Sequence, residues 1–510
     1  MALTQTITTP TITYEQPLGL YIDGKWVKGV NGSVFETINP ATEEPIVSVH
    51  EATAEDVDFA VAAARKAFNG VWRQTTPTAR GVLLSKLADL LEQHADTLAS
   101  IDALDNGKAI AMARVDVQMA SGCLRYYSGW ADKIHGKTID TDPDTFNYTR
   151  HEAIGVCGQI IPWNFPLVSW AWKIGPALAA GNTVVMKTAE QTPLSALYAT
   201  TLVEKAGFPA GVVNTLSGFG KVAGAAVASH PGIDKVSFTG STGVGRSILQ
   251  ASSKSNIKNL TLELGGKSPN IIFNDANLDD AIHWAHFGIF YNHGQVCCAG
   301  TRIYVQSGIY DKCIKAFKAK TSDIVVGDPF SADTFQGPQI SKAQFDRIMG
   351  YIQSAKDDGA TVELGGRRHG EKGYYIEPTI FSNVNSRMKI VQEEVFGPVC
   401  VICKFETEED VIQAGNDTSF GLAAAVHTTN LKTAIRVSNR LNAGTVWVNG
   451  YNMISYQVPF GGFKESGIGR ELGKYALNEY TQVKSVRIRL ADGICVRTFV
   501  GSFYGSHMTA

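Results

Sequence analysis

The sequence predicts an α/β protein built on parallel β-sheets. Between residues 154 and 272, short apolar runs typical of buried strands alternate with amphipathic segments typical of helices. A second region with the same alternation covers residues 265–457. Strands and helices that alternate at this spacing form right-handed βαβ units, whose strands are parallel. The 510 residues, of which 44% are hydrophobic and 18% charged, predict a globular chain of about three structural units.

The elements of the first region can be placed in order. Residues 54–122 precede it and are expected to be helical, because apolar residues recur at intervals of three and four; a long helix there, within 80–107, ends at an Asn-Gly pair. The helix predicted over 192–207 has Pro193 near its start and Gly207 past its end. The predicted strands are 182–187, 211–218, 234–241 and 258–266, and the other predicted helices are 221–230 and 243–254.

The second region and two arms supply further strands. The strands expected in the second region lie within 302–306, 378–384, 399–405 and 443–450. Residues 136–155 predict a hairpin that turns at Asp-Pro-Asp, and residues 480–490 alternate like an edge strand. These two strand-like arms are available for pairing with another subunit.

Composition excludes several classes of partner. The net charge is −2 and the chain has no basic block, so a nucleic-acid partner is not expected. The most apolar long window, 153–172, is interrupted by polar residues and prolines that a bilayer would leave unsatisfied, so no membrane span is expected. The first residues match neither a secretory signal nor a transit peptide. Eight irregularly spaced cysteines indicate a reducing compartment, and we expect a cytoplasmic protein.

Two pairs of cysteines could carry chemistry. Cys400 and Cys403 spell C-x-x-C, but the flanking residues predict a strand, which would point the two thiols to opposite faces. No second C-x-x-C completes a zinc set, so a metal site is not expected. Cys297 and Cys298 stand side by side in "YNHGQVCCAGTR". From the residues alone this pair is either a reactive site or two small core residues.

Candidate binding residues gather at the carboxyl ends of the predicted parallel strands, where ligands of such sheets bind. Lys187, Ser241 and Glu263 are expected on one rim of one sheet. Gly240 and Gly245 stand at a strand-to-helix junction, where free N–H groups suit a phosphate; a simple tight turn is the alternative.

Three polar residues suggest further roles at this site. Glu190 follows Lys187 closely, and a carboxylate there would accept from ribose hydroxyls and repel a 2′-phosphate, unless both are ordinary surface charges. Glu263 stands between two leucines, where loss of hydration raises a carboxyl pKa toward that of a general base. A structural carboxylate paired with a cation is the alternative. Asn164 stands in "PWNFP" and could donate to an oxyanion or form a turn.

Together these segments resemble a known family. The chain contains, in family order, "PWNFP", "KTAEQTP", "FTGST", "LELGGKS", "YNHGQVCCAGTR", "EEVFGP" and "PFGGFKESGIGRELG". This set resembles the NAD(P)-dependent aldehyde dehydrogenase superfamily over about residues 19–490, and it is most similar to cytosolic fungal-type members. The resemblance implies a Rossmann-like cofactor domain (1–135 and 152–264), a second α/β catalytic domain (265–477), and a small β oligomerisation arm with a tail (136–151 and 478–510).

The resemblance also implies roles for individual residues. Cys297 would be the nucleophile and Cys298 a neighbour without that role. Glu263 would activate water, and Asn164 would hold the oxyanion together with the Cys297 N–H. The implied cofactor contacts are Trp163 (through its backbone), Lys187, Glu190, Gly220, Gly240, Ser241, Gly245, Leu264, Glu394 and Phe396. The implied aldehyde tunnel is lined by Phe165, Trp172 and Phe460, with Ser169 and Ile454 facing it.

The implied activity is oxidation of an aldehyde to a carboxylate through a covalent thiohemiacetal and thioester. NAD is expected because Glu190 opposes a 2′-phosphate; NADP is the alternative because Lys187 could offset that charge. A CoA-acylating enzyme and an inactive crystallin-like protein are the rival interpretations, and both are disfavoured by Glu263. A Cys-His hydrolase using His293 is disfavoured for the same reason. We expect a neutral, apolar aldehyde, a homotetramer built from dimers, and a loose tail after Leu490.

Overall fold

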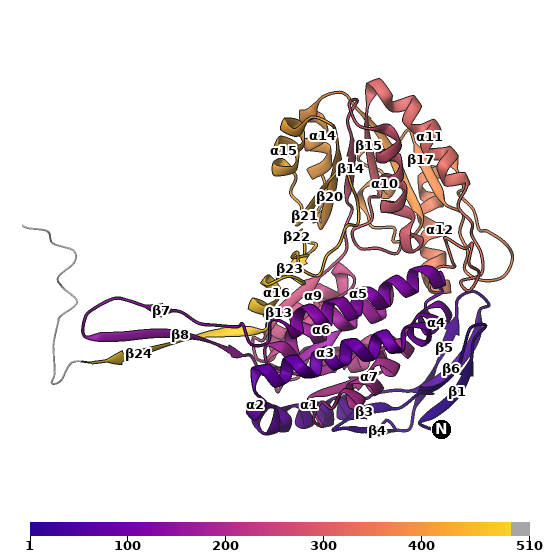
Figure 1. Ribbon diagram of the computed structural model, residues 1–510. Helices are drawn as coiled ribbons and strands as arrows, with labels where there is room; N and C mark the ends of the chain where they lie inside the picture. The colour runs from indigo at the N-terminus through magenta and orange to yellow at the C-terminus, as the bar shows by residue number, and fades with distance from the viewer. Residues whose placement is uncertain (491–510) are drawn as a thin grey trace, which may run out of the picture.

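Two mainly parallel sheets form the frame of the molecule. The structure is a computed structural model and describes residues 1–490 (Figure 1). One sheet has eight strands and the other seven, which confirms the predicted α/β class. The predicted tail, including Cys495, lies outside the described residues. Among the residues described, no helix is both long and apolar enough to cross a bilayer.

The eight-stranded sheet is parallel at its centre and antiparallel at its edges. Its strand order is β23-β13-β12-β9-β10-β11-β3-β4. The parallel strands are β9 (Val156–Ile160), β10 (Thr183–Lys187), β11 (Val213–Leu216), β12 (Lys235–Thr239) and β13 (Asn259–Glu263). The antiparallel edge strands are β3 (Leu20–Ile22), β4 (Lys25–Val27) and β23 (Gly467–Ile468). The last of these comes from the far end of the chain and closes the edge beside β13.

Helices cover both faces of this sheet, so its central strands are apolar on both sides. One face packs against α3 (Pro77–Gln93), α5 (Ile110–Ser128), α6 (Pro166–Ala179) and α7 (Leu194–Ala206). The other face packs against α1 (Ala54–Asn69), α8 (Ala225–Ser229) and α9 (Thr242–Lys254). The short helix α2 (Val71–Gln74) follows α1.

Two predicted helices differ from expectation. The long helix expected within 80–107 is interrupted at His94 and continues as α4 (Ala95–Asp105). The interruption has a tertiary cause, because the His94 ring nitrogen Nδ1 forms a 2.8 Å hydrogen bond with the Tyr198 hydroxyl. The helix expected over 221–230 begins as a π-helical turn, η1 (Gly220–Gly224), and becomes α-helical only in α8.

The seven-stranded sheet has the order β16-β17-β18-β15-β14-β20-β21. Its strands are β14 (Pro269–Ile272), β15 (Arg302–Gln306), β16 (Thr361–Leu364), β17 (Thr379–Ser382), β18 (Val399–Phe405), β20 (Ala423–His427) and β21 (Thr445–Val448). Its helices are α10 (Leu278–Phe290), α11 (Tyr310–Ser322), α12 (Lys342–Asp357), α13 (Lys389–Gln392), α14 (Glu408–Asn416) and α15 (Leu431–Arg440). The short turns are η2 (Tyr291–Gly294) and η3 (Ser307–Ile309), and the short pair is β19 (Phe420–Gly421) with β22 (Phe463–Lys464).

Cys400 and Cys403 lie in β18, as predicted, and belong to different packing clusters. Both are free thiols. Within residues 1–490, no group of three or more His, Cys, Asp or Glu side chains could hold a metal ion.

A three-stranded sheet projects from the body as a long arm (Figure 1). It is formed by β7 (Thr138–Ile139), β8 (Thr145–Ala153) and β24 (Thr481–Arg489), and α16 (Tyr475–Glu479) leads into the last strand. The predicted Asp-Pro-Asp turn lies between β7 and β8, and β24 pairs antiparallel with β8 along its whole length. The arm exposes Phe146, Val483 and Ile488.

Several strands were missing from the prediction, and six of them show the physical reasons. Four of them form two hairpins near the amino terminus, β1 (Thr4–Thr8) with β2 (Thr13–Pro17) and β5 (Val34–Asn39) with β6 (Glu44–His50). These strands are short and rich in polar residues, so they carry little apolar alternation. The buried strand β20 reads AAAVH and has a single β-branched residue, Val426, among alanines, which are depleted in strands. The sixth, β14, is four residues long, begins with Pro269 and closely follows the glycine pair at 265–266.

Two glycine substitutions should change stability in opposite directions. Gly207 caps α7 with φ +93°, a left-handed conformation in which alanine is strained, so Gly207→Ala should destabilise the protein by about 1 kcal/mol. Gly350 lies inside α12 at an exposed position, and a Cβ there would meet no atom within 4 Å. Gly350→Ala should therefore stabilise the protein by about 0.5–1 kcal/mol. Thermal unfolding should give a lower Tm for Gly207→Ala and a higher Tm for Gly350→Ala than for the parent protein. Equal or reversed Tm shifts would refute the assignment of Gly207 as the left-handed cap of α7.

Candidate active site

The carboxyl ends of the parallel strands bring three predicted residues to one rim. Lys187 ends β10, Glu263 ends β13, and Ser241 stands just after β12. β12 pairs in parallel with β13, and β9 joins β12 to β10. The structure thus places all three on the rim that the sequence indicated.

Glu263 is a carboxyl group almost removed from water. The residue is 3% exposed, and its Oε1 atom has no hydrogen-bond partner among the described residues. Burial, with a smaller contribution from the nearby Glu471 carboxyl, raises the pKa of Glu263 to about 8. The Cys297 thiol and the Lys173 ammonium act in the opposite direction. Near neutral pH this group is therefore balanced between its acid and base forms.

The two adjacent cysteines have different surroundings. Cys297 is partly exposed, whereas Cys298 is fully buried. The Tyr451 hydroxyl donates to the Cys298 carbonyl at 2.8 Å, and the Cys298 thiol donates to Asn452 Oδ1 at 3.4 Å. Hydrogen bonding to Cys298, burial and the adjacent Glu263 carboxyl hold the pKa of Cys297 well above its ordinary value. Ionisation of Cys297 therefore needs a proton acceptor, and Glu263 lies beside it.

A strained turn carries Cys297. Asn292, His293 and Gly294 all have positive φ, at +49°, +60° and +71°. The Asn292 amide holds this turn by donating to the carbonyls of Asn164 at 3.2 Å and Gln295 at 3.3 Å. Left-handed non-glycine residues cost free energy and concentrate at functional sites.

His293 does not provide the base of a Cys-His pair here. Its Nδ1 atom lies 2.8 Å from the Pro338 carbonyl, to which it donates. Burial lowers the pKa of the ring to about 3, so the imidazole stays neutral. The neutral His293 ring therefore anchors the turn through its hydrogen bond to the Pro338 carbonyl.

Asn164 lies against the same turn. Its side-chain amide donates one hydrogen to the Gln295 carbonyl at 2.8 Å. The second amide hydrogen is not used in that bond. The backbone N–H of Cys297 has no acceptor among residues 1–490. These two donors suit a developing oxyanion next to the Cys297 sulfur.

Trp163 and Phe396, which the resemblance assigns to the cofactor, contact each other through their rings. Their ring centroids are 5.1 Å apart and the rings are nearly perpendicular, at 86°. The Trp163 carbonyl already accepts from Asn106 Nδ2 at 2.6 Å and from Thr192 Oγ1 at 3.3 Å. Phe396 has φ +58°, and its carbonyl accepts from Gln344 Nε2 at 2.8 Å. The resemblance implies that the Trp163 backbone contacts the cofactor. This contact would be made in addition to the two hydrogen bonds that the Trp163 carbonyl already accepts from Asn106 and Thr192.

A pair of glycines after β13 lets the candidate groups approach one another. The N–H of Gly266 donates to Glu394 Oε1 at 3.0 Å. A side chain at Gly265 would overlap the Glu394 carboxyl, and one at Gly266 would overlap the Cys297 carbonyl oxygen. Burial raises the pKa of Glu394 to about 7. The end of β13 thus contacts both the thiol-bearing turn and the Glu394 loop.

The remaining residues that the resemblance assigns to the cofactor lie near the carboxyl ends of β10, β11 and β12. Lys187 Nζ lies 2.8 Å from Glu190 Oε2, at the place expected for a ribose. Ser241 caps α9, whose first turn contains no acidic residue, so its amino end favours an anion. Gly245 packs against Leu264, because a Cβ there would lie 2.8 Å from the leucine.

Two further glycines were assigned to this rim. Gly220 begins η1 after β11, and a Cβ there would meet nothing within 4 Å. Gly240 follows β12, where a Cβ would overlap the Phe238 ring. The backbone at Gly220 therefore has open space beside it, while Gly240 is required by packing.

The aromatic residues predicted to line an aldehyde tunnel form close ring pairs. Trp172 and Phe460 meet edge to face at 5.9 Å, and Phe165 stacks on Tyr291 at 6.1 Å and 27°. Ser169 is buried, and Ile454 is half-buried against the same core. Sequence analysis missed Tyr291 and also Phe287, whose ring lies 4.8 Å from that of Tyr291. Their four-residue spacing at the end of a helix, just before the cysteine motif, is the signal that could have found them.

A buried ion pair behind Glu263 was also missed. Lys173 and Glu471 form this pair, and Lys173 donates further to Thr239 at 2.8 Å and Ser237 at 3.2 Å. Lys173 is the lone charged residue in the apolar sequence of α6, which is the pattern of a buried, partnered lysine. Its charge favours the carboxylate form of Glu263.

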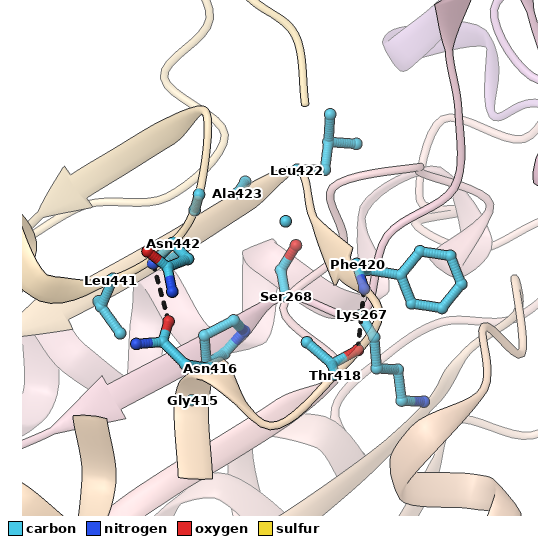
Figure 2. A pocket seen from close by; sticks show the side chains of 14 residues that line it. Lys267, Ser268, Gly415, Asn416, Thr418, Phe420, Leu422, Ala423, Leu441 and Asn442 are labelled. Atoms are coloured by element: carbon cyan, nitrogen blue, oxygen red, sulfur yellow. Dashed lines mark hydrogen bonds between the residues drawn. The ribbon is translucent and has the colours of Figure 1, made fainter. Parts of the chain in front are cut away.

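A small cavity lies beyond the glycine pair (Figure 2). It is lined by Lys267, Ser268 and the segments around Asn416, Phe420 and Asn442, and none of its lining residues was predicted to be part of the site. The Asn442 N–H donates to Asn416 Oδ1 at 2.8 Å, and the Phe420 N–H donates to Thr418 Oγ1 at 3.3 Å. The lining groups bond to each other, which indicates a structural role.

Comparison with known proteins agrees with this geometry. A model of the aldehyde dehydrogenase family matches residues 26–486. An aldehyde dehydrogenase of Aspergillus niger is 69% identical over 490 residues, covering 96% of this chain and 99% of that protein. One of Emericella nidulans is 67% identical over 489 residues, covering 96% and 98%. The solved NAD+ complex of an aldehyde dehydrogenase from Bacillus cereus is 51% identical with a TM-score of 0.92, covering 93% of this chain and 97% of that chain. The resemblance to fungal members is thus confirmed, and the chain belongs to the aldehyde dehydrogenase family.

Proposed function

We propose that the protein oxidises an aldehyde to a carboxylate with NAD, using Cys297 as the nucleophile. The observation that carries the proposal is the contact between the Cys297 thiol and the buried Glu263 carboxyl. The names of the fungal relatives and the NAD+ complex of the Bacillus cereus enzyme support the reaction and the cofactor. Lys187, Glu190 and the amino end of α9, whose first turn has no acidic residue, would hold the ADP half of a dinucleotide.

The first half of the reaction forms a bond between Cys297 and the aldehyde carbon. Glu263 accepts the thiol proton, and the thiolate attacks the carbonyl to give a thiohemiacetal. Asn164 Nδ2 and the Cys297 N–H stabilise the oxyanion. NAD would supply the acceptor for the hydride whose loss converts this intermediate to the thioester, and Glu394 and Phe396 would hold its nicotinamide end.

The second half hydrolyses the thioester. Glu263 first releases the thiol proton to solvent and then removes a proton from water. The water oxygen attacks the acyl carbon, and the C–S bond breaks to release the carboxylate product and the Cys297 thiolate. The buried Lys173 favours the base form of Glu263, and Glu471 balances the charge of Lys173. A base placed for water supports hydrolysis over transfer of the acyl group to CoA. The presence of Cys297, Glu263 and Asn164 together argues against an inactive crystallin-like protein.

We also propose a division of labour within the molecule. The eight-stranded sheet and its helices (1–135 and 152–264) bind the cofactor, and the part around the seven-stranded sheet (265–477) carries the nucleophile. The arm (136–151 and 478–490) joins subunits into a homotetramer, which its exposed apolar residues support. The aromatic path past Phe165, Trp172 and Phe460, with Ile454 beside it, suits a neutral apolar aldehyde. A cytoplasmic location is part of this proposal.

Replacing Cys297 and Cys298 one at a time shows which of the two thiols is the nucleophile. Cys297→Ala should lower kcat by at least about 10³-fold, because no covalent intermediate can form. Cys298→Ala should stay within about tenfold of the parent, because its thiol is buried and bonded to Asn452. Absorbance of the reduced nicotinamide with a short aliphatic aldehyde measures both. Aldehyde oxidation by the Cys297→Ala protein at the native rate would exclude the mechanism.

Turnover should depend on pH through Glu263. Burial raises its pKa to about 8, and only the deprotonated form activates water, so turnover should rise with pH up to about 8 and then level off. Glu263→Gln should slow the first burst of reduced nicotinamide and lower steady-state turnover by about 10²-fold or more, because the thiol and the attacking water both lose their proton acceptor. Stopped-flow and steady-state rates between about pH 6 and pH 9 test this. Full turnover by Glu263→Gln would contradict the assigned role.

Cofactor preference should change with Glu190. Its carboxylate would repel a 2′-phosphate, so Glu190→Gln should raise kcat/KM for NADP relative to NAD by about tenfold. Glu204→Gln, which removes an exposed carboxylate from α7, serves as the control and should leave the ratio unchanged. An unaltered ratio in Glu190→Gln would show that another group selects the cofactor.

A further inference from the structure

A buried segment between α4 and α5 contacts the loop that presents Asn164. Residues 106–108 read Asn-Gly-Lys, and both Asn106 and Lys108 are fully buried. The Gly107 backbone lies between Pro40 and Pro338, where a Cβ would come within 2.8 Å of either ring. The segment is therefore held on both sides. None of the site roles proposed above involves it.

Asn106 fixes the residue that precedes Asn164. Its side-chain amide donates to the Trp163 carbonyl at 2.6 Å, which is a short bond in a buried setting. Thr192 Oγ1 donates to the same carbonyl at 3.3 Å. The orientation of the Trp163–Asn164 peptide unit is thus set by two donors, and the nearer one comes from this segment.

Lys108 fixes the residue that follows Asn164. Its ammonium lies 4.0 Å from the centroid of the Phe165 ring and pairs with the carboxylate of Asp116. The Tyr291 hydroxyl lies 3.5 Å from the same carboxylate, and the Tyr291 ring stacks on Phe165 at 6.1 Å. Phe165 thus contacts both the Lys108 ammonium and the Tyr291 ring, and each of these groups interacts with the Asp116 carboxylate.

The chemistry of the pair argues for a positioning role. Lys108 and Asp116 have no exposed side-chain surface, and a fully buried ion pair is in general weak evidence for added stability. A cation over a ring inside a protein gives a directional attraction that fixes the ring. Here the ring belongs to the aldehyde path and its backbone adjoins the oxyanion donor.

We propose that Lys108 and Asn106 are positioning residues for Asn164. Together they hold Phe165 and Trp163, the two neighbours of Asn164 in the chain, so that its amide meets the oxyanion on Cys297. This inference rests on the proposed function, since it assigns these residues a part in the same acylation step. A misplaced oxyanion donor slows the chemistry while leaving cofactor binding intact.

Lys108→Met tests the proposal, because methionine keeps much of the side-chain length and removes the cation. With saturating NAD and a short aliphatic aldehyde, we expect the single-turnover rate of reduced nicotinamide formation to fall by at least about tenfold. The Kd for NAD, followed by protein fluorescence, should stay within about twofold. Arg65→Met is the matched control: it breaks the Arg65–Asp234 pair, 2.5 Å long, at the amino ends of the strands. It should lower Tm without changing the single-turnover rate.

A second arm separates positioning from general structural damage. In a Phe165→Leu background the ring that Lys108 holds is absent, so Lys108→Met should there lower the rate by less than about threefold. If Lys108→Met does not fold, Asn106→Ala carries the same test through the Trp163 carbonyl and should also slow the single turnover. A folded Lys108→Met protein with a native single-turnover rate would overturn the proposal, as would an equal loss in both backgrounds. Failure of the parent protein itself to reduce NAD with any aldehyde would instead refute the proposed function.

Discussion

The site depends on a carboxyl group kept out of water beside a thiol. Glu263 ends the strand β13, where the antiparallel strand β23 closes the edge of the sheet and excludes solvent. Desolvation raises the pKa of the carboxyl to about 8, and the same carboxyl helps to hold the pKa of Cys297 high. Each group is therefore the natural proton partner of the other. A solvated glutamate at this position would be permanently ionised at neutral pH and a far weaker base.

The other parts of the site follow from the need to bring distant segments to that point. The glycine pair at 265–266 is small enough for the Glu394 carboxyl and the Cys297 backbone to approach the end of β13. The strained turn at 292–294 directs the cysteine toward the loop of Asn164, and Asn292 bonds the two together. Behind Glu263, the Lys173–Glu471 pair places charge in the core without exposing it to water. Such strain and buried charge are stabilised by the extensive packing around both sheets.

Sequence reasoning placed what depends on local pattern and missed what depends on distant contacts. The strands β10, β12 and β13 carry short groups of buried apolar residues separated by amphipathic helices, so their ends, and with them Lys187, Ser241 and Glu263, could be located in advance. The break at His94 could not, because its cause is a hydrogen bond to Tyr198. Lys173 and Glu471 are 298 residues apart, and the sequence around neither residue indicates that the two form an ion pair. The resemblance to a family supplied the roles of Cys297 and Asn164, which the residues alone left open.

Covalent catalysis by Cys297 is tested most directly by trapping the acyl-enzyme intermediate. Turnover with NAD and an aldehyde is quenched rapidly in acid, and the protein is digested and mapped by mass spectrometry. The account predicts the mass of the acyl group on the peptide that contains Cys297 and Cys298, with fragmentation assigning it to Cys297. An acyl group on Cys298 or on another residue, or an unmodified protein during active turnover, would contradict it.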